Sequence, residues 1–276
     1  MTKKIAFQGE PGAFSHTASN NVFPGEQAVG YVTFEETINA VQSGKADYAV
    51  VPVENSLYGR ITDIHHLLPE SGLHIIGETY LRVEMTLLGV PGATLADIKA
   101  VQSLSVALGQ CRKFIAGNGF RTINAVDTAG SAREVAQKGD KSVAAIASRF
   151  AGEIYGLDLL AANIEDAAHN TTRFLVLSPT PQEAPANAGN VKTTFVFRVR
   201  NVPAALYKAM GGFATNGVNM TKLESYMVGG AFTATQFYAD IEGHPSDPGV
   251  VLAFEELGFF TDHFKILGVY PATENK

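Results

Sequence analysis

The chain has 276 residues, of which 46% are hydrophobic, and a formal net charge of −6. This length suits two domains with real cores, and a negative chain without a block of Lys or Arg is not typical of proteins that bind nucleic acid or anionic membranes. The single cysteine, Cys111, excludes an intramolecular disulfide and a Cys-based zinc site. No apolar run approaches the length of a membrane span, and the N-terminus lacks the pattern of a signal peptide. We therefore expect a cytoplasmic protein.

The first elements alternate between strand and helix. The pattern predicts a strand over 3–8, a Gly-Glu-Pro-Gly loop from Gly9, and a helix that begins near Ala13. Such a junction directs backbone N–H groups and a helix dipole at whatever lies over it, which favours an anion. Gly and Pro also mark ordinary turns, so an anion site and a plain turn both remain open.

Two more predicted elements follow, a strand over 28–32 and a helix over 34–43. The helix start carries a capping-box signature, with Thr33 at the cap and Glu36 three residues later. Gly44 then ends the helix.

A polar cluster follows the next predicted strand, which covers 48–53. Glu54, Asn55 and Ser56 stand at its C-terminal end. Open α/β sheets place ligand contacts at this end of their strands. A plain polar turn is the alternative interpretation.

The middle of the chain repeats strand and helix. A helix holds His65 and His66, which we expect to face solvent because adjacent histidines point in different directions and no carboxylate stands at ligand spacing. The further predictions are two strand-like runs within 73–90, strands at 101–103, 120–124, 143–147 and near 158–162, and helices through 111–115, near 129–138 and through Tyr155. This alternation indicates a parallel or mixed α/β sheet.

One helix of this region contains Gln110 and Cys111 between apolar neighbours. An apolar-flanked cysteine is typical of a small core residue rather than a nucleophile. The amide of Gln110 must find hydrogen-bond partners if it is buried.

A second polar cluster stands before an apolar run that predicts a strand ending near 178. Asn170, Thr171, Thr172 and Arg173 supply an amide, two hydroxyls and a fixed cation. Asn and Thr could simply turn the chain into the strand. A guanidinium beside a buried strand needs an anionic partner, and its planar fork suits a carboxylate. That partner is either another side chain or a substrate.

The C-terminal part begins after a segment rich in Pro, Ala and Asn, residues 179–190, which has the composition of a linker. Strands are predicted over 191–200, 218–226, 231–241 and 263–270, and helices over 203–215 and 247–257. The resulting βαββαβ order is the ferredoxin-like plan. Because its sheet edge is open, we expect pairing with a second copy.

Taken together, these segments resemble the prephenate dehydratase family, joined to a C-terminal ACT regulatory domain, over nearly the whole chain. The resemblance rests on Gly9 to His16, Val51 to Ser56 with Gly59, Gln110-Cys111, Ile164-Glu165-Asp166 and Asn170 to Leu177. It implies an α/β fold in which a two-lobed, periplasmic-binding-protein-like catalytic domain with substrate in its cleft precedes a ferredoxin-like βαββαβ ACT domain. The expected boundaries are 1–180 for the catalytic domain, 181–190 for the linker and 191–276 for the ACT domain.

The resemblance implies the decarboxylating dehydration of prephenate to phenylpyruvate in L-phenylalanine biosynthesis, with no metal or organic cofactor. It implies that Thr172 donates a hydrogen bond to the departing hydroxyl, while Arg173 holds either a substrate carboxylate or a structural partner, Glu165 or Asp166. The expected catalytic residues are Thr172, Arg173, Glu54, Asn55, Ser56 and Gln110. The expected substrate-binding residues are Gly12, Ala13, Phe14, Ser103, Thr171 and Phe174, with backbone amides near Gly12 and Ala13 as extra donors.

The sequence departs from the family pattern in two places. Ser103-Leu-Ser-Val-Ala-Leu108 replaces a Ser-His-Pro-Gln-Ala-Leu segment, and the ACT part has Ala-Ala-Leu and Glu-Ser-Tyr-Met where phenylalanine-responsive relatives have Gly-Ala-Leu and Glu-Ser-Arg-Pro. The candidate effector residues are Asn201, Ala204, Ala205, Leu206, Glu224 and Ser225. Because the methyl group of Ala204 crowds this loop and the Arg is lost, we expect phenylalanine sensitivity to be weak or altered.

The expected partners are prephenate, phenylalanine as a possible effector, and further copies of the chain in a homodimer or homotetramer. Two other functions remain open. An arogenate dehydratase acts on a substrate that differs only by an amino group on its side chain, and a non-catalytic sensor would use the same lobes to bind a small molecule.

Overall fold

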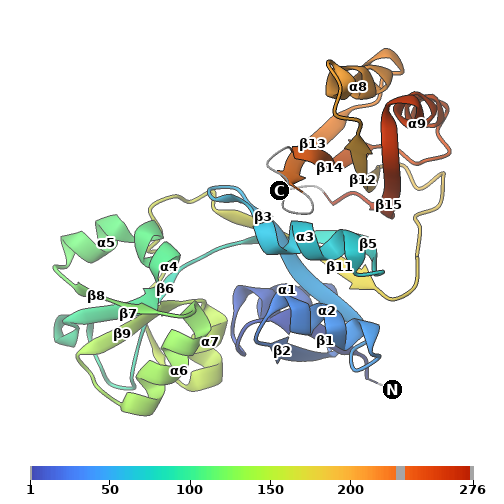
Figure 1. Ribbon diagram of the computed structural model, residues 1–276. Coiled ribbons are helices and arrows are strands. Elements are labelled where there is room, and N and C mark those ends of the chain that lie inside the picture. Colours follow the sequence, from blue (N-terminus) through green and yellow to red (C-terminus); the bar gives the residue numbers. More distant parts are fainter. Residues whose placement is uncertain (1, 228–233, 274–276) are drawn as a thin grey trace. The chain divides into compact units, whose positions relative to one another are not determined.

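A computed structural model describes residues 2–227 and 234–273 of the chain (Figure 1). The chain divides into two compact units. The first contains Met1–Ile61 and Thr79–Phe174, and the second contains Thr62–Glu78 and Leu175–Lys276. Strands β5 (His74–Arg82) and β11 (Thr171–Ser178) contribute residues to both units.

The first unit contains two sheets. In the first sheet, β1 is parallel to both β2 and β3, and the strand order is β11-β3-β1-β2, with β4 paired to β3. Its elements are β1 (Lys4–Gln8), α1 (Phe14–Val22), β2 (Gln27–Tyr31), α2 (Phe34–Gln42), β3 (Tyr48–Asn55) and β4 (Gly59–Arg60). Ile5, Ala18, Val50 and Phe174 form a buried cluster on this sheet. The first half of β11 therefore joins the N-terminal segment in one core.

The second sheet of this unit has the order β10-β6-β9-β7-β8. Its elements are β6 (Thr86–Gly89), a 3-10 turn at Leu95–Asp97, β7 (Ala100–Leu104), α4 (Ser105–Gln110), α5 (Arg112–Gly117), β8 (Arg121–Ala125), α6 (Thr128–Lys138), β9 (Val143–Ala147), α7 (Arg149–Tyr155) and β10 (Asp158–Ala161). Alternate residues of β9 face opposite sides: Ala144 and Ile146 pack in the cluster with α4 and α5, and Ala145 and Ala147 in the cluster with α6 and α7. A strand buried on both faces is a nearly continuous apolar run, as the sequence shows here.

The second unit carries the predicted βαββαβ order. Its elements are α3 (Thr62–Glu70), β12 (Val191–Val199), α8 (Ala205–Thr215), β13 (Met220–Met227), β14 (Ala234–Glu242), α9 (Pro248–Phe260) and β15 (Thr261–Pro271). The strand order is β13-β14-β12-β15, and β15 also pairs in parallel with β5. A core of phenylalanines, among them Phe195, Phe197 and Phe213, lies between this sheet and helices α8 and α9. Residues 231–233 of the predicted third strand lie outside the described residues.

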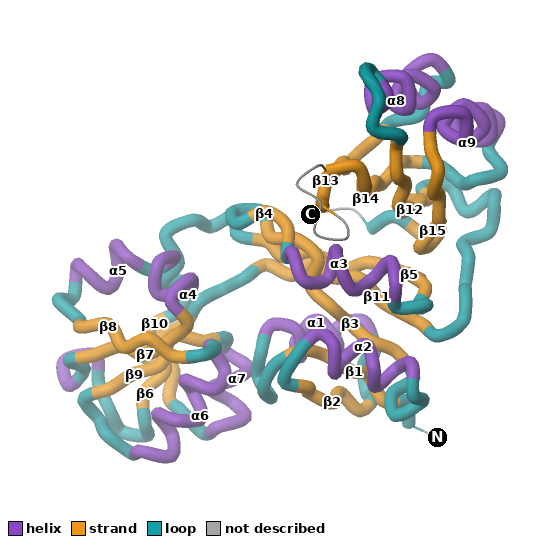
Figure 2. The backbone as a smooth tube through the Cα atoms, viewed as in Figure 1, coloured by secondary structure: helices purple, strands orange, loops and turns teal. Residues whose placement is uncertain are grey.

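The predicted linker has no helix or strand between β11 and β12, and Figure 2 shows it as a continuous loop. This loop nevertheless packs against strands of the second unit. Ala184 is buried against Val191 and Val269, and its N–H donates to the Val269 carbonyl over 2.9 Å.

The α/β prediction is confirmed, and several local expectations need correction. The predicted helix through Cys111 is broken at that residue into α4 and α5. His65 is buried rather than solvent-facing, because its ring packs edge-on against Tyr238, 4.9 Å between centroids; His66 is exposed as expected. At the start of α2 the Thr33 hydroxyl accepts the Glu36 amide, but the Glu36 carboxylate accepts the amide of Val32 instead of closing the capping box.

Within the described residues, no helix is long and apolar enough to cross a bilayer.

Candidate active site

The two polar clusters of the sequence lie side by side at the ends of neighbouring strands. β3 runs through Asn55 and β11 begins at Thr171, so most of each cluster belongs to a strand rather than to a turn. The Ser56 amide donates to the Thr171 carbonyl over 2.8 Å, and the Thr171 amide donates to the Ser56 hydroxyl over 3.0 Å. The Ser56 hydroxyl itself donates to the His169 carbonyl. These bonds fix the relative position of the two strand ends.

The side-chain amide of Asn55 determines the direction of the hydrogen bonds around Thr172. Its oxygen accepts the backbone N–H groups of Leu57 and Tyr58 over 3.0 and 3.1 Å, which fixes which end of the amide is the NH2 group. That NH2 group donates to the Asn170 side-chain oxygen over 2.7 Å and to the Thr172 hydroxyl over 3.0 Å. Because the Thr172 oxygen is already an acceptor, its own proton is available to donate elsewhere.

Arg173 forms an ion pair with Glu54 on the neighbouring strand, with 2.9 Å between Nη1 and Oε1. The arginine side chain is 3% exposed and that of Glu54 is 30% exposed. The acids considered as partners from the sequence have other contacts: Glu165 accepts the Met85 amide and contacts Arg82, and Asp166 accepts the Lys113 amide. The guanidinium thus joins the two polar clusters.

A cavity of about 320 Å3 opens beside Thr172 and Asn55 within the first unit. Residues from both sheets line it: Gln8, Gly9, Ala13, Phe14, Ser15, Pro52, Asn55, Tyr58, Ile61, Val83, Met85, Leu104, Val106, Ala107, Gln110, Asp127, Thr128, Thr172 and Phe174. We call it the main cavity because Thr172 and Asn55 line it. Its walls are mostly apolar, with a few amides and hydroxyls that could orient a small ligand.

Two buried amides near the main cavity have hydrogen-bonding atoms without a partner. These are the side-chain oxygen of Gln110, which lines the cavity, and the side-chain NH2 of Asn170. Gln110 is 9% exposed and Asn170 is 1% exposed. A buried polar atom without a partner costs free energy, so each marks a place where a ligand or a water molecule could bind.

Most of the predicted site residues fall into two groups. Asn55, Gln110, Thr172, Ala13, Phe14 and Phe174 line the main cavity. Glu54, Ser56, Thr171 and Arg173 support it through the contacts between β3 and β11. Ser103 is fully buried and donates to the Ile146 carbonyl, which gives it a place in the second sheet instead.

The amides expected to bind an anion at Gly12 and Ala13 are already occupied. The Gly12 N–H donates to His16 Nδ1 over 3.1 Å, and the Ala13 N–H donates to the Glu10 carbonyl over 3.0 Å. Gly12 has φ +91°, and a Cβ there would lie 2.7 Å from the Ala151 Cα. In this arrangement the loop packs against α7 and neither amide is free for a ligand.

Several residues that line the main cavity were missed from the sequence. Val83 and Met85 lie on the segment that connects the two sheets, and Asp127 caps helix α6. An Asp followed by Thr before a helical pattern is a recognisable capping signal. Nothing local to it indicates that the cap also borders a cavity.

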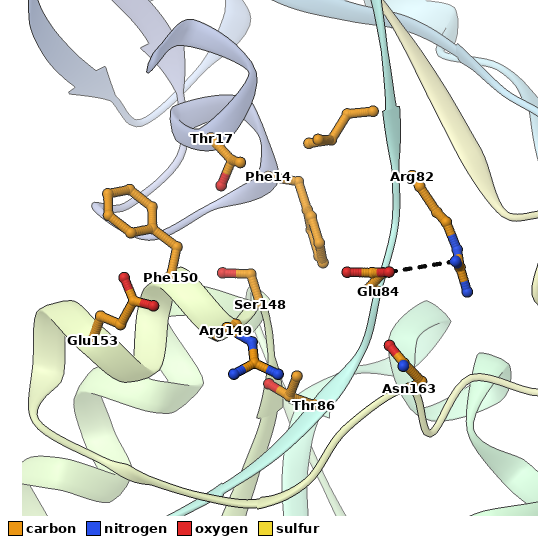
Figure 3. A pocket seen from close by; sticks show the side chains of 11 residues that line it. Phe14, Thr17, Arg82, Glu84, Thr86, Ser148, Arg149, Phe150, Glu153 and Asn163 are labelled. Atoms are coloured by element: carbon orange, nitrogen blue, oxygen red, sulfur yellow. Dashed lines mark ion pairs between the residues drawn. The ribbon is translucent and has the colours of Figure 1, made fainter. Parts of the chain in front are cut away.

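A second cavity, of about 240 Å3, borders the connecting segment (Figure 3). Arg82, Glu84 and Thr86 line it, whereas Val83 and Met85 line the main cavity, as expected when successive side chains of an extended segment alternate. Arg82 pairs with Glu84 over 3.4 Å. Phe14 lines both cavities, so this ring and the connecting segment form the wall between them.

Cys111 is fully buried, as expected for a core residue. Burial, together with the smaller effect of the negative charges of Glu165 and Asp166, raises the pKa of its thiol to about 12. The thiol is therefore protonated at neutral pH and is not a nucleophile there.

The candidate effector residues of the second unit fall in two places. Asn201 and Ala204 precede α8, Ala205 and Leu206 are its first residues, and Glu224 and Ser225 lie on β13. Ala204 has φ +62°, a left-handed conformation that favours glycine. On β13, Tyr226 occupies the position of the lost arginine, and its hydroxyl accepts the Gln236 side-chain amide over 2.7 Å.

Comparison with known proteins identifies relatives along the whole chain. A sequence profile of the family described as prephenate dehydratase matches residues 5–182. A Komagataeibacter europaeus protein named bifunctional N-acyl-homoserine lactone acylase/prephenate dehydratase is 51% identical over 269 residues, covering 98% of this chain and 96% of that protein. The Arabidopsis thaliana protein arogenate dehydratase/prephenate dehydratase 1, chloroplastic, is 39% identical and covers 97% of this chain and 72% of that protein.

Solved structures share the fold, and two of them are similar over nearly the whole chain. GqqA, described as a quorum-quenching acylase, has a TM-score of 0.93 and 50% identity, covering 98% of both chains. The prephenate dehydratase of Arthrobacter aurescens in complex with L-Phe has a TM-score of 0.88 and 29% identity, covering 98% of this chain and 90% of that chain.

Proposed function

Because the chain belongs to the prephenate dehydratase family, we propose that it converts prephenate to phenylpyruvate, with release of water and carbon dioxide, as a step of L-phenylalanine biosynthesis in the cytoplasm. The observation that carries this proposal is the orientation of Thr172. Its oxygen accepts from Asn55 while its side chain lines the main cavity, so the hydroxyl proton is the one free to reach a ligand.

The reaction needs a hydrogen-bond donor at one oxygen atom. As the ring carboxylate leaves as carbon dioxide, its bonding electrons enter the ring, and the C4 hydroxyl departs and takes up one proton from the solvent to become water. A Thr hydroxyl is a weak acid, so Thr172 acts as a fixed donor to the departing oxygen rather than as a free acid. Such a donor contributes about 10² to 10⁴ in rate.

The other polar residues position the substrate and Thr172. Asn55 donates to the Thr172 hydroxyl and is itself held by Asn170, which accepts from the same NH2 group, and the unpartnered Gln110 oxygen offers an acceptor to the substrate. The short ion pair supports a scaffold role for the buried Arg173 side chain, since its charge is matched by Glu54. Glu54 and Ser56 then hold the ends of β3 and β11 in position and do not contact the reacting atoms.

The test is to mix the purified protein with prephenate near neutral pH and measure phenylpyruvate. Thr172→Ala removes the donor, and we expect it to lower kcat at least 100-fold. Thr122→Ala is the matched control, because Thr122 is exposed on β8 away from the main cavity, and it should keep full activity. Absence of product from folded wild type contradicts the enzyme; full activity of Thr172→Ala contradicts the assigned role.

We also propose that residues 1–180 form the catalytic domain, 181–190 the linker and 191–276 an ACT regulatory domain through which copies of the chain associate as a homodimer or homotetramer. The βαββαβ order supports this, as does the L-Phe complex of the Arthrobacter aurescens relative. Regulation by phenylalanine should be weak, because Ala204 adds a methyl group to the left-handed loop position and Tyr226 is already hydrogen-bonded to Gln236.

Titrating phenylalanine while following phenylpyruvate formation checks this expectation. Weak or absent inhibition is the expected result. Strong inhibition at low phenylalanine concentration would show that the two replacements do not matter.

A second candidate activity comes from the relative that is 51% identical over almost the full length of both chains. Its name includes N-acyl-homoserine lactone acylase, and the apolar wall of the main cavity, with Val83, Met85 and Leu104, could accept an acyl chain. Release of free homoserine lactone from an N-acyl substrate tests it. A protein that only senses small molecules would show neither activity.

A further inference from the structure

The charge of the main cavity is unusual for a site that receives a dianion. Of the described residues that line it, Asp127 alone has a charged side chain, and it is negative. Arg173, the cation among the proposed site residues, is paired with Glu54 and is not part of the lining. Prephenate carries two carboxylates. When it binds in this cavity, its negative charge is repelled by that of Asp127.

The Asp127 carboxylate has capacity for another hydrogen bond. One oxygen, Oδ1, caps α6 by accepting the Gly130 amide over 2.6 Å. A carboxylate accepts about four hydrogen bonds, so Oδ2 remains able to accept one from a ligand. Arg133, on the same helix, pairs with Glu10 over 3.3 Å instead. Asp127 is half-buried, which limits screening of its charge by water.

The two candidate substrates differ at one group that such a carboxylate distinguishes. Prephenate has a carbonyl on its side chain next to the carboxylate, whereas arogenate has an ammonium group at that carbon. A half-buried carboxylate attracts the ammonium through a charge-assisted hydrogen bond and disfavours a side chain with carboxylate alone. Building on the proposed dehydratase function, we propose that Asp127 is a specificity-determining residue that binds the side-chain ammonium of arogenate, so this chain also accepts arogenate.

Asp127→Asn is a clean test of this role. Asn is as good a helix cap as Asp, so α6 keeps its start while the charge is removed. The readout is the ratio of kcat/KM for arogenate to that for prephenate, because both substrates lose the same ring carboxylate and C4 hydroxyl. We expect the ratio to fall at least about tenfold, because arogenate loses a charge-assisted hydrogen bond that prephenate does not make.

The matched control is Glu134→Gln. It makes the same carboxylate-to-amide change on the same helix, outside the main cavity, and should leave the ratio within about twofold. An unchanged ratio in Asp127→Asn, or an equal fall in Glu134→Gln, overturns the proposal.

A binding experiment separates this inference from the proposed reaction. Calorimetric titration of each substrate into Thr172→Val, and into the same variant with Asp127→Asn, gives the ratio of the two dissociation constants without turnover. The preference for arogenate should fall about tenfold when Asp127 is replaced, and an unchanged ratio overturns the role of Asp127. Failure of the dehydratase proposal would appear separately, as absence of product from wild type with either substrate.

Discussion

Thr172 depends for its chemistry on a neighbour far away in sequence. A threonine hydroxyl rotates freely and can donate or accept. Here the Asn55 amide, held by two backbone N–H groups, occupies its acceptor side and leaves the proton for the cavity. Both polar clusters can be recognised in the sequence. A buried strand does not need an amide, hydroxyls and a guanidinium at its end, so their presence there indicates a site. The hydrogen-bond direction could not be predicted, since Asn55 and Thr172 are 117 residues apart and no local spacing relates them.

At Ala204 the backbone conformation predicts a stabilising substitution. The residue has φ +62° at the N-cap of α8, where an L side chain costs about 1–2 kcal/mol. Ala204→Gly relieves that strain but gives the unfolded chain more freedom, at a cost of about 0.4–1 kcal/mol. We expect a net gain of about 0.5–1 kcal/mol in the free energy of unfolding, measured by urea denaturation.

The same helix provides the control. Ala214 is exposed near the end of α8 with ordinary helical geometry, so Ala214→Gly should lower the free energy of unfolding by up to about 1 kcal/mol. If Ala204→Gly destabilises the protein as Ala214→Gly does, the left-handed backbone at Ala204 is not strained.

At the scale of elements, the loop between β1 and α1 joins the two sheets of the first unit. Three bonds hold it: Arg133 pairs with Glu10, Tyr155 donates to the Pro11 carbonyl, and Ser148 donates to the Gly12 carbonyl. The sequence suggested an anion site here because a Gly-containing loop before a helix can present free amides. The same free amides can be used by the protein itself, and local sequence does not distinguish the two uses.

His16 makes the same loop sensitive to pH. Burial lowers the pKa of His16, and its Nδ1 must be unprotonated to accept the Gly12 N–H. Because the folded-state pKa lies below the ordinary value of 6.5, the unfolded chain takes up the proton first as pH falls. The contribution of His16 to stability is therefore present above pH 6.5 and is lost progressively below it.

His16→Asn should flatten this part of the pH profile, since the Asn oxygen can still accept the Gly12 amide but does not titrate in this range. Urea unfolding of both proteins between pH 5 and 8 measures it. The stability advantage of wild type should shrink as pH falls below 6.5. A constant difference between the two proteins across this range would contradict the role of His16.

The strands and helices themselves were largely predictable, for a physical reason. Side chains alternate along a strand, so the continuous apolar run of β9 indicates that both of its faces are buried. When such runs alternate with helical patterns, the expected fold is a sheet covered by helices. The break at Cys111 was not predictable from that pattern. It depends on the backbone turning within an apolar segment, with the Cys111 N–H donating to the Leu108 carbonyl instead of continuing one helix.

At the scale of the whole chain, an early segment packs with late ones. Thr62–Glu78 belongs to the second unit. Helix α3 places His65 and His66 against Tyr238 and Tyr226, and Lys265 donates to the Pro69 carbonyl over 2.6 Å. The expectation that His65 faces solvent was wrong because its packing partner, Tyr238, lies 173 residues later in the chain. The sequence pattern around the histidine does not indicate a partner that far away.

A buried ion pair between β5 and β12 also joins the early segment to the C-terminal part of the chain. The Lys192 ammonium donates to both carboxylate oxygens of Glu78, over 2.7 and 2.9 Å, and the Glu78 residue is 7% exposed. Breaking a buried pair by removing one partner costs about 3–5 kcal/mol. Lys192→Met should therefore lower the free energy of unfolding of the full chain by that amount, whereas Lys208→Met, at an exposed site on α8, should change it by less than about 0.5 kcal/mol.

These contacts predict how the proposed catalytic domain behaves alone. A fragment of residues 1–180 keeps Thr62–Glu78 but loses Tyr238, Lys265 and Lys192, so the buried faces of α3 and β5 are exposed to water. We expect the fragment to unfold at a clearly lower urea concentration than the full chain and to bind a hydrophobic dye that the full chain does not bind. A fragment with the same urea midpoint as the full chain would contradict this, and would show that the C-terminal residues contribute little to the stability of α3 and β5.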